Sequence, residues 1–314
     1  MVPCGACNAK NFIPGDLPPM ETLPCTKCGH PVMIPVRMRQ FELRAVIASG
    51  GMGTVFKAYD LALTRHVALK MLKKEMAEDK EVMEAFYREA RASASLNHTN
   101  IIHIYTFDEY EQKPYLVMEL ADQGSLDSWI TRGRVPELNV LDIGIKMASA
   151  LTTALKHNLL HRDIKPGNIL FNSEGEPKLV DFGLARSAEG DTEYSEDNTV
   201  WGTPDYVAPE KIRQEPETFH SDMYSLCATL YHALTGRPPF EAETTEALVQ
   251  AHVDQPVLAP MDLVQDITKQ SSDAILIGLN KLPKDRFATY DDLHMALEAA
   301  RSQLLIQRYS SAEE

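Results

Sequence analysis

The sequence predicts an α+β protein in which a strand-rich segment precedes a helix-rich one. Over residues 41–118, apolar residues fall in short runs typical of β-strands. Over residues 122–305, apolar residues recur at intervals of three and four, which is typical of amphipathic helices. Residues 1–34 differ from both because they are rich in proline and carry four of the five cysteines. We therefore expect two lobes preceded by a small separate module.

The elements follow in order along the chain. Runs at 41–47, 67–70, 101–105 and 115–118 predict strands, and an apolar stripe predicts a helix over 78–96. In the second lobe, a helix is predicted over 137–157 and a last helix after Thr289. Between them, Ser221 is predicted to cap a helix that ends at Gly236. Residues 35–40 connect the first module to the strands, and their composition leaves open a hinge or a packed spacer.

Composition narrows the class of protein. The chain has 314 residues, of which 44% are hydrophobic and 24% charged, which is ordinary for globular domains. No run of about 18 apolar residues occurs, and the N-terminus lacks the pattern of a signal peptide. We therefore expect a cytoplasmic protein without a transmembrane helix. The net charge is −14, so the body of the chain is expected to repel nucleic acid and anionic membranes.

The four N-terminal cysteines form two Cys-x-x-Cys pairs, Cys4 with Cys7 and Cys25 with Cys28. Each pair can place two thiolates on one tight turn, and four thiolates complete the tetrahedral site that Zn²⁺ prefers. Since so short a segment buries little apolar surface, metal binding would supply most of its folding free energy. The segment resembles a zinc ribbon with a structural site. Redox-active or disulfide-bonded cysteines are the alternative.

The purpose of the zinc ribbon is less constrained by the sequence. Phe12 is its only aromatic residue, and basic residues are few. Docking of a protein partner, or packing against the rest of the chain, is therefore favoured over nucleic-acid binding.

The densest group of reactive side chains lies in residues 161–168, His-Arg-Asp-Ile-Lys-Pro-Gly-Asn, and Asp-Phe-Gly follows at 181–183. Residues 178–180 form a brief apolar strand that would bring Asp163 and Asp181 near one ligand. Two Asp, one Asn and one Lys are the groups that phosphoryl transfer requires, and Mg²⁺ prefers hard oxygen ligands. For either motif alone, an ordinary charged loop is the alternative.

In this order, the two motifs resemble those of the protein kinase family. The resemblance implies a bilobal fold, with a β-rich small lobe and an α-helical large lobe, over residues 41–305. It implies that Asp163 accepts or orients the proton of a substrate hydroxyl and that Lys165 stabilises the transferred phosphoryl group. It also implies that Asn168 and Asp181 bind magnesium. Lys165 is typical of serine/threonine kinases.

The phosphate-binding motifs of the same family occur upstream. Gly50, Gly51 and Gly53 would let backbone amides approach the phosphates, although an unliganded hairpin turn would look the same. Lys70 lies seventeen residues after Gly53 and is implied to bind the α- and β-phosphates. Ala48 replaces the first glycine of the family pattern, so we expect a modest effect on nucleotide affinity.

The resemblance also assigns the adenine site. Val55 and Ala68 would cover the base, and Met118 would line the back of the pocket. Main-chain groups of Glu119 and Ala121 would meet the edge of the base.

Two further side chains complete the nucleotide site. Glu89 lies nineteen residues after Lys70 and is implied to hold that lysine in position, although a solvated surface glutamate would fit the helix equally well. Ser125, near the start of the next helix, could reach the ribose.

Outside the nucleotide site, the resemblance assigns residues that hold the large lobe together. Asp222 is implied to brace the catalytic loop, and Glu210 to pair with Arg286. Cys227, the one cysteine outside the ribbon, is expected to be a buried, inert thiol.

The acidic, aperiodic stretch 187–199 occupies the position of the kinase activation segment. We expect phosphorylation of Thr192, Ser195 or Thr199, with the phosphate pairing with Arg162.

We predict an ATP- and Mg²⁺-dependent serine/threonine protein kinase that phosphorylates its own activation loop and resembles bacterial members of the family. The predicted parts are a zinc ribbon (1–34), a linker (35–40), a kinase domain (41–305) and a tail (306–314). Expected partners are ATP, proteins with serine or threonine, and a protein docked on the ribbon. A pseudokinase scaffold, a small-molecule phosphotransferase and a zinc-ribbon regulatory binding protein are the alternatives.

Overall fold

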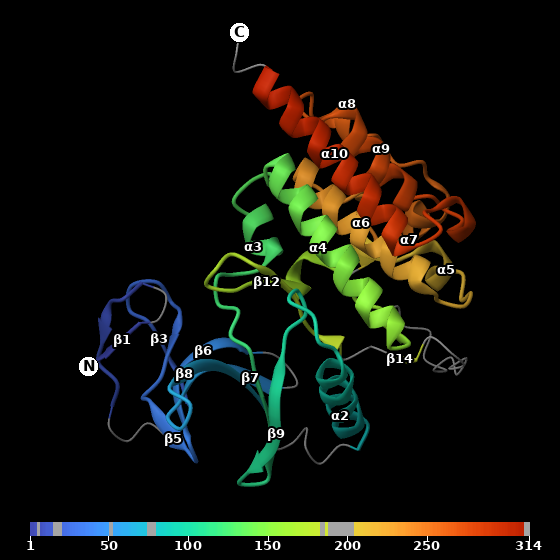
Figure 1. The fold of residues 1–314 in the computed structure, drawn as a ribbon. Helices are drawn as coiled ribbons and strands as arrows, with labels where there is room; N and C mark the ends of the chain where they lie inside the picture. Colours follow the sequence, from blue (N-terminus) through green and yellow to red (C-terminus); the bar gives the residue numbers. More distant parts are fainter. Residues whose placement is uncertain are drawn as a thin grey trace. The chain divides into compact units, whose positions relative to one another are not determined.

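The computed structural model describes residues 1–4, 7–14, 21–49, 53–73, 80–182, 186–187 and 204–310 (Figure 1). The chain divides into two compact units. The first consists of Met1–Ala94 and Ile102–Asp122, and the second of Ser95–Ile101 and Gln123–Glu314.

Two short hairpins form the N-terminal module. Strand β1 (Val2–Pro3) pairs with β2 (Lys10–Asn11), and β3 (Leu23–Pro24) pairs with β4 (Pro31–Val32), both antiparallel. Their small core consists mainly of Cys4, Ile13, Cys25 and Val32. Such a core is too small to stabilise a fold without a further crosslink.

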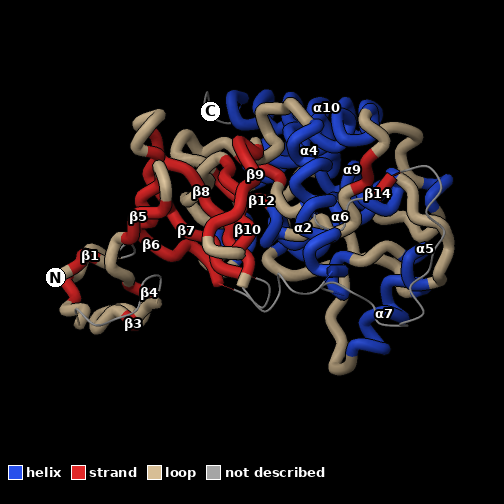
Figure 2. Tube along the Cα trace, turned by 90° about the horizontal axis from the view of Figure 1, so that it is seen from below, coloured by secondary structure: helices blue, strands red, loops and turns tan. Residues whose placement is uncertain are grey.

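An antiparallel sheet of six strands dominates the first unit and is drawn in red in Figure 2. In spatial order, its strands are β5 (Val36–Met38), β6 (Phe41–Ser49), β7 (Gly53–Asp60), β8 (Arg65–Leu72), β10 (Lys113–Met118) and β9 (Ile104–Tyr110). Helix α2 (Lys80–Ser95) confirms the predicted helix over 78–96 and packs on one face of the sheet through Phe86 and Ala90. The other face covers a separate apolar core.

Residues 35–40 are a packed connection rather than a hinge, because β5 pairs with β6 at the edge of the sheet. Met38 is fully buried in the core of the sheet, and so is Met33. Val32 belongs instead to the core of the N-terminal module. Neighbouring residues therefore lie in two different cores, which joins the module to the sheet.

One predicted strand is misplaced. The apolar run 101–105 was expected to be a strand, but β9 begins only at Ile104. Ile101 is buried and forms an isolated parallel bridge with Leu179, within the second unit. Ile101 and Ile102, where the chain passes from one unit to the other, are buried, whereas Tyr105 at the end of the run is exposed.

Helices form most of the second unit. They are α3 (Leu126–Ile130), α4 (Glu137–Lys156), α5 (Pro209–Ile212), α6 (Phe219–Thr235), α7 (Thr245–Asp254), α8 (Pro260–Leu263), α9 (Lys269–Gly278) and α10 (Tyr290–Ser310). Single turns of 3₁₀ helix lie among them in the described residues, namely η1 (Pro166–Asn168), η3 (Pro204–Tyr206) and η4 (Pro283–Asp285). Two short antiparallel pairs complete the unit, β11 (Leu159–Leu160) with β14 (Arg186–Ser187) and β12 (Ile169–Phe171) with β13 (Pro177–Leu179).

Helix α4 confirms the predicted helix over 137–157 and packs against α6 and α10, as Figure 1 shows. A side chain at Gly144 would approach Leu230 to 2.8 Å, so glycine allows the close contact with α6. Within the described part of the chain, α4 is the one helix long and apolar enough to cross a membrane. Half of that stretch is buried inside the protein, as in core helices, which satisfy the same test.

Helix α6 begins three residues earlier than predicted. Ser221 was expected to be its cap, but the N-cap is Thr218, and Ser221 is the third helical residue of a capping box. Both residues carry hydroxyls at capping-box spacing, so the sequence pattern alone does not distinguish them. At the other end, Gly236 has φ of 81° and stops the helix as predicted.

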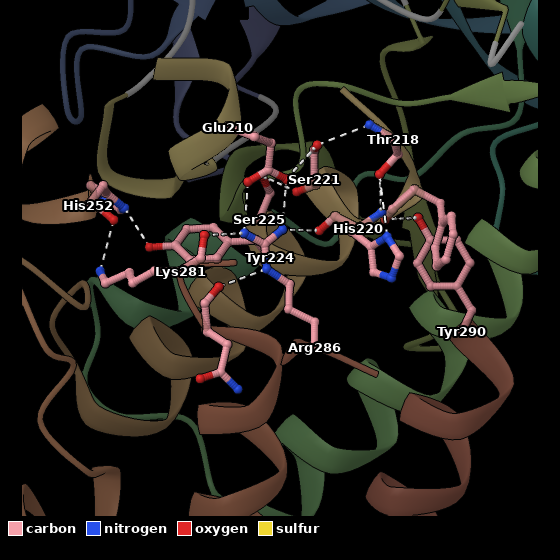
Figure 3. Close-up of polar contacts among 12 residues, drawn as sticks. Glu210, Thr218, His220, Ser221, Tyr224, Ser225, His252, Lys281, Arg286 and Tyr290 are labelled. Atoms are coloured by element: carbon pink, nitrogen blue, oxygen red, sulfur yellow. Dashed lines mark hydrogen bonds and ion pairs between the residues drawn. The ribbon is translucent and has the colours of Figure 1, made fainter. Parts of the chain in front are cut away.

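A buried ion pair between Glu210 and Arg286 joins α5 to the segment before α10, as predicted (Figure 3). Two bonds of 2.7 Å connect the guanidinium to the two carboxylate oxygens. Arg286 also donates to the carbonyls of His220 (2.7 Å) and Asn280 (2.8 Å), and Ser221 donates to Glu210 (2.7 Å). Burial alone would raise the pKa of Glu210, but the bonds from Arg286 outweigh it and hold the pKa below its usual value.

Breaking this pair is expected to destabilise the second unit strongly. Arg286→Met leaves the Glu210 carboxylate buried without its partner, so the free energy of unfolding should fall by about 3–5 kcal/mol. Chemical denaturation of the two proteins measures the difference. The control is Lys269→Met, which breaks the exposed pair with Asp273 and should change stability by less than about 0.5 kcal/mol. Equal losses for both variants would contradict the assignment.

Cys227 is fully buried, and burial raises the pKa of its thiol to about 12. The thiol is therefore protonated and unreactive at neutral pH, which confirms the expected inert residue.

Candidate active site

Three of the predicted catalytic side chains meet at one carboxylate oxygen in the loop between β11 and β12. Oδ2 of Asp163 accepts hydrogen bonds from Nζ of Lys165 at 2.7 Å and from Nδ2 of Asn168 at 3.0 Å. Nδ2 of Asn168 also donates to the backbone carbonyl of Asp163 at 2.7 Å. The charge of Asp163 is thus balanced by Lys165, and its position is set by Asn168.

The backbone of this loop is anchored by Asp222 on α6. The Asp222 carboxylate accepts the backbone N–H groups of His161 and Arg162, each at 2.7 Å. Asp222 is buried, and its burial raises the pKa of the carboxyl group above its usual value, although the two N–H donors oppose this shift. The predicted bracing role is confirmed, and it fixes the two residues that directly precede Asp163.

Asp181 is held next to this loop by its neighbours on both sides. The backbone N–H of Val180 donates to the carbonyl of Asn168 at 3.0 Å. The Val180 carbonyl in turn accepts from Nε2 of His161 at 3.0 Å. Phe182 is fully buried and packs edge-on against His161, with ring centroids 4.7 Å apart. Asp181 itself has φ of 71°, a rare backbone conformation of the kind found at functional sites.

The donor set at this position fits a magnesium ion. The amide nitrogen of Asn168 is committed to Asp163, so its amide oxygen is the atom that can bind a cation. Asp181 is exposed and supplies carboxylate oxygens. Hard oxygen ligands from one amide and one carboxylate are what Mg²⁺ takes when phosphate and water fill its other positions.

The predicted adenine and phosphate residues of the first unit share one face of the sheet. In the strand register, Val55 lies opposite Lys70, and Ala68 lies opposite Met118. Directly opposite residues point to the same face, so these four side chains lie together. Lys70 takes part in further interactions within the protein.

The segment after β10 holds the residues predicted to meet the adenine edge. The backbone N–H of Glu119 donates to the carbonyl of His103 at 2.8 Å, and the Glu119 side chain pairs with the same histidine at 3.2 Å. Ala121 is buried two residues further on. Their contact with a nucleotide stays a prediction.

The glycine loop is described at its two ends only. Gly50 and Gly51 lie outside the described residues. A side chain at Gly53 would lie 2.3 Å from the carbonyl oxygen of Met71, so the contact between β7 and β8 requires glycine there. Ala48 lies in β6 opposite Val55, and a strand accommodates its methyl group.

For two residues predicted at the nucleotide site, Glu89 and Ser125, the structure does not test the predicted contact. Glu89 lies in α2, but its side chain is outside the described part of the structure, so its pairing with Lys70 stays a prediction. Ser125 is the N-cap of α3, where its hydroxyl accepts from the N–H of Ser128 at 3.2 Å. That bond explains the serine locally, and its contact with a ribose stays a prediction.

The four N-terminal cysteines converge as predicted, with all four sulfurs within 4.8 Å of one another. Sγ of Cys4 lies 3.7 Å from Sγ of Cys28, and Sγ of Cys7 lies 3.6 Å from Sγ of Cys25. Four sulfurs at Zn–S distances of about 2.3 Å in a tetrahedron lie about 3.8 Å apart. None of them is in a disulfide, so the geometry fits a zinc ion.

Asn11 supports the cysteine cluster, although no motif in the sequence indicates this role. Its side chain is buried, with Oδ1 accepting the backbone N–H of Thr26 at 2.9 Å. Its Nδ2 donates to Sγ of Cys25 at 3.5 Å. Asn11 therefore links the first hairpin to the second pair of cysteines. No spacing rule points to such a residue, because its partners lie fourteen and fifteen residues away.

Arg162 is the remaining predicted site residue with a described side chain. Its Nε atom is buried and lacks a hydrogen-bond partner within the described ranges. The loop residues predicted to meet it, Thr192, Ser195 and Thr199, lie outside those ranges.

Comparison with known proteins agrees with this arrangement, since residues 41–304 match the protein kinase domain. The probable serine/threonine-protein kinase PknB of Corynebacterium glutamicum is 35% identical over 264 residues, covering 81% of this chain and 41% of that protein. Serine/threonine-protein kinase PrkC of Bacillus subtilis is 34% identical over 262 residues, covering 83% and 40% respectively. Serine/threonine-protein kinase PknA of Mycobacterium tuberculosis is 35% identical over 269 residues, covering 84% and 62%.

The chain therefore belongs to the protein kinase family and resembles bacterial serine/threonine kinases. The predicted fold class, with a β-sheet small lobe and a helical large lobe, is confirmed. A kinase domain implies ATP and Mg²⁺ in general. The chain spans about two fifths of the length of the first two relatives, and the cysteine module lies outside the family match.

Proposed function

We propose that this chain is an ATP- and magnesium-dependent serine/threonine protein kinase. The observation that carries the proposal is the convergence of Lys165 and Asn168 on the carboxylate of Asp163. A carboxylate held by an amide and an ammonium is positioned to accept a hydrogen bond from a substrate hydroxyl. The alternatives are a pseudokinase scaffold and a small-molecule phosphotransferase, and neither would transfer phosphate to a protein.

Each residue has a proposed role in the transfer. Asp163 orients the hydroxyl of a serine or threonine and takes its proton as the oxygen bonds to the γ-phosphorus of ATP. The bond from that phosphorus to the β-phosphate oxygen breaks, and ADP leaves. Lys165 lies beside that carboxylate and stabilises the negative charge of the transferred phosphoryl group. Asn168 and Asp181 hold magnesium, which neutralises phosphate charge when bound.

The nucleotide is proposed to bind the shared face of the small-lobe sheet. Val55, Ala68 and Met118 contact the base, with the backbone of Glu119 and Ala121 at its edge. Lys70, positioned by Glu89, binds the α- and β-phosphates beneath Gly50, Gly51 and Gly53 of the glycine loop, and Ser125 lies near the ribose.

We further propose that Cys4, Cys7, Cys25 and Cys28 bind one structural zinc ion. Since none of these cysteines forms a disulfide and kinases need ATP, the cytoplasm is the proposed location of this part of the chain. Residues 1–34 form the ribbon, 41–305 the kinase domain, and the ribbon is proposed to dock a protein rather than nucleic acid or membrane.

The activation segment is proposed to be an autophosphorylation site. The buried Nε of Arg162 supports this, because a buried guanidinium N–H without a partner among the described residues can donate a hydrogen bond to a phosphate.

The deciding experiment is transfer of the γ-phosphate of ATP to a generic protein and to the chain itself, with and without Mg²⁺. Wild type should label both proteins only with Mg²⁺, and mass spectrometry should find phosphate on Thr192, Ser195 or Thr199. Asp181→Asn weakens the magnesium site and should reduce labelling by at least about 100-fold.

Equal labelling by wild type and Asp181→Asn would overturn the proposed function. Wild type that binds ATP without transferring phosphate to either protein would also overturn it and would support a pseudokinase scaffold or a small-molecule phosphotransferase. Full activity with none of the three activation-segment residues modified would remove the autophosphorylation proposal alone.

A further inference from the structure

An ion pair borders the proposed base site within the first unit. Nζ of Lys57, on β7, lies 2.5 Å from Oδ2 of Asp122. Asp122 directly follows Ala121, which is proposed to meet the adenine edge. The side chains of Lys57 and Asp122 are 36% and 20% exposed, so the pair is partly shielded from water.

Lys57 lies on the same face of the sheet as the proposed base contacts. It is two residues after Val55 on β7, and alternate residues of a strand point to the same side. In the register it lies directly opposite Ala68, which in turn lies opposite Met118. The pair with Asp122 is therefore on the nucleotide face and not on the back of the sheet.

The pair connects two segments that do not hydrogen-bond to each other as strands. Strand β7 pairs with β8, and β8 pairs with β10, which leads into the segment of Asp122. Strand β8 thus separates β7 from β10. The side chain of Lys57 crosses this distance and connects the strand that carries Val55 to the segment after Ala121.

We propose that the ion pair between Lys57 and Asp122 positions the base of the nucleotide by tying β7 to the segment that meets the adenine edge. This inference rests on the proposed kinase function, because it assigns residues at the border of that nucleotide site. The pair closes the outer side of the base site and keeps Val55 at a fixed height above the base. It does not touch the transferred phosphate, so it acts on binding and not on the chemical step.

Asp122 is also the counter-charge of a locally basic surface. His66 lies on β8, opposite Tyr59 of β7. Its pKa is lowered by burial and by the positive charges of Lys57 and Arg44, and the negative charge of Asp122 opposes this shift. Removing Asp122 leaves Lys57 beside these groups without compensation. Removing Lys57 leaves Asp122 with its other interactions. The pair therefore also balances charge at this border of the site.

The test is the Kd of ATP with Mg²⁺, measured by calorimetry on the full chain, together with KM and kcat of phosphate transfer. Lys57→Met and Asp122→Asn each remove one charge and keep much of the volume. Each should raise Kd and KM about two- to five-fold and leave kcat within about two-fold. The exchanged double variant Lys57→Asp with Asp122→Lys should recover most of the lost affinity.

The control is Arg39→Met, which breaks the more exposed ion pair with Asp108 in the same unit. Its Kd should equal that of wild type. Unchanged Kd in both single variants would overturn the inference, and so would an equal rise in the control or no recovery in the exchanged variant. Wild type that binds no ATP would instead overturn the proposed function, and this inference with it.

Discussion

Replacing Asp163 with asparagine is expected to lower kcat of phosphate transfer by about 10²–10⁴-fold. Asparagine keeps the size of the side chain but cannot take up the proton of the substrate hydroxyl. It also removes the negative charge that holds Lys165 at 2.7 Å. Because the proposed base contacts lie elsewhere in the chain, the Kd of ATP should change by less than about three-fold.

Steady-state transfer to a generic protein, together with ATP calorimetry, separates the two effects. The matched control is Asp142→Asn in the same unit. Asp142 lies on α4, and its carboxylate pairs with Arg301 on α10. That variant should keep the kcat of wild type. An Asp163→Asn protein that is folded, binds ATP and transfers phosphate at the wild-type rate would remove Asp163 from the mechanism.

Removal of the proposed zinc ion should unfold the N-terminal module. Without a cation, four sulfurs within 4.8 Å lose their common partner, and the small core of this module cannot replace it. The backbone N–H of His30 lowers the pKa of the Cys28 thiol. Hydrogen bonding with Cys7 and burial outweigh this effect and raise the pKa to about 12. A cation at the centre would stabilise the thiolate instead.

The loss should extend into the small lobe, because Met33 lies in the core of the sheet and follows Val32 of the module. Burial of a methionine contributes about 1.5–3 kcal/mol. If the metal-free module pulls Met33 out of the core, the thermal midpoint should fall by about 5 °C.

Metal analysis and thermal unfolding test this expectation. Wild type should contain one zinc ion per chain, Cys25→Ser none, and Cys227→Ala one, since Cys227 lies outside the cluster. A strong chelator should reproduce the unfolding of Cys25→Ser. Metal-free protein with an unchanged midpoint would show that the module is an appendage and not a brace, and a wild type without metal would refute the zinc site.

The sequence predicted that Asp163, Lys165 and Asn168 would meet, because these residues are close together along the chain. Asp163, Lys165 and Asn168 lie within six residues, so the local turn alone brings them near one another. Helices such as α2 and α4 were also predictable, since their apolar periodicity records which face is buried. The pair of Glu210 and Arg286 was found through family resemblance only, because 76 residues separate them.

Other features had no local signal. The cap of α6 was misplaced because Thr218 and Ser221 are both able to accept the N-terminal hydrogen bonds. The strand at Ile101 was misplaced because an apolar run reports burial and not strand pairing. The need for glycine at position 53 comes from the carbonyl of Met71, a neighbour brought close by the sheet.

By itself, the sequence determined the order of the lobes, the catalytic loop and the two cysteine pairs, because chemistry within a few residues depends on spacing alone. The tertiary structure decided how distant segments meet. It placed Met33 in the core of the sheet, Asn11 against the second cysteine pair, and Lys57 against Asp122. Such contacts depend on the packing and register of whole elements, which no short stretch of sequence encodes.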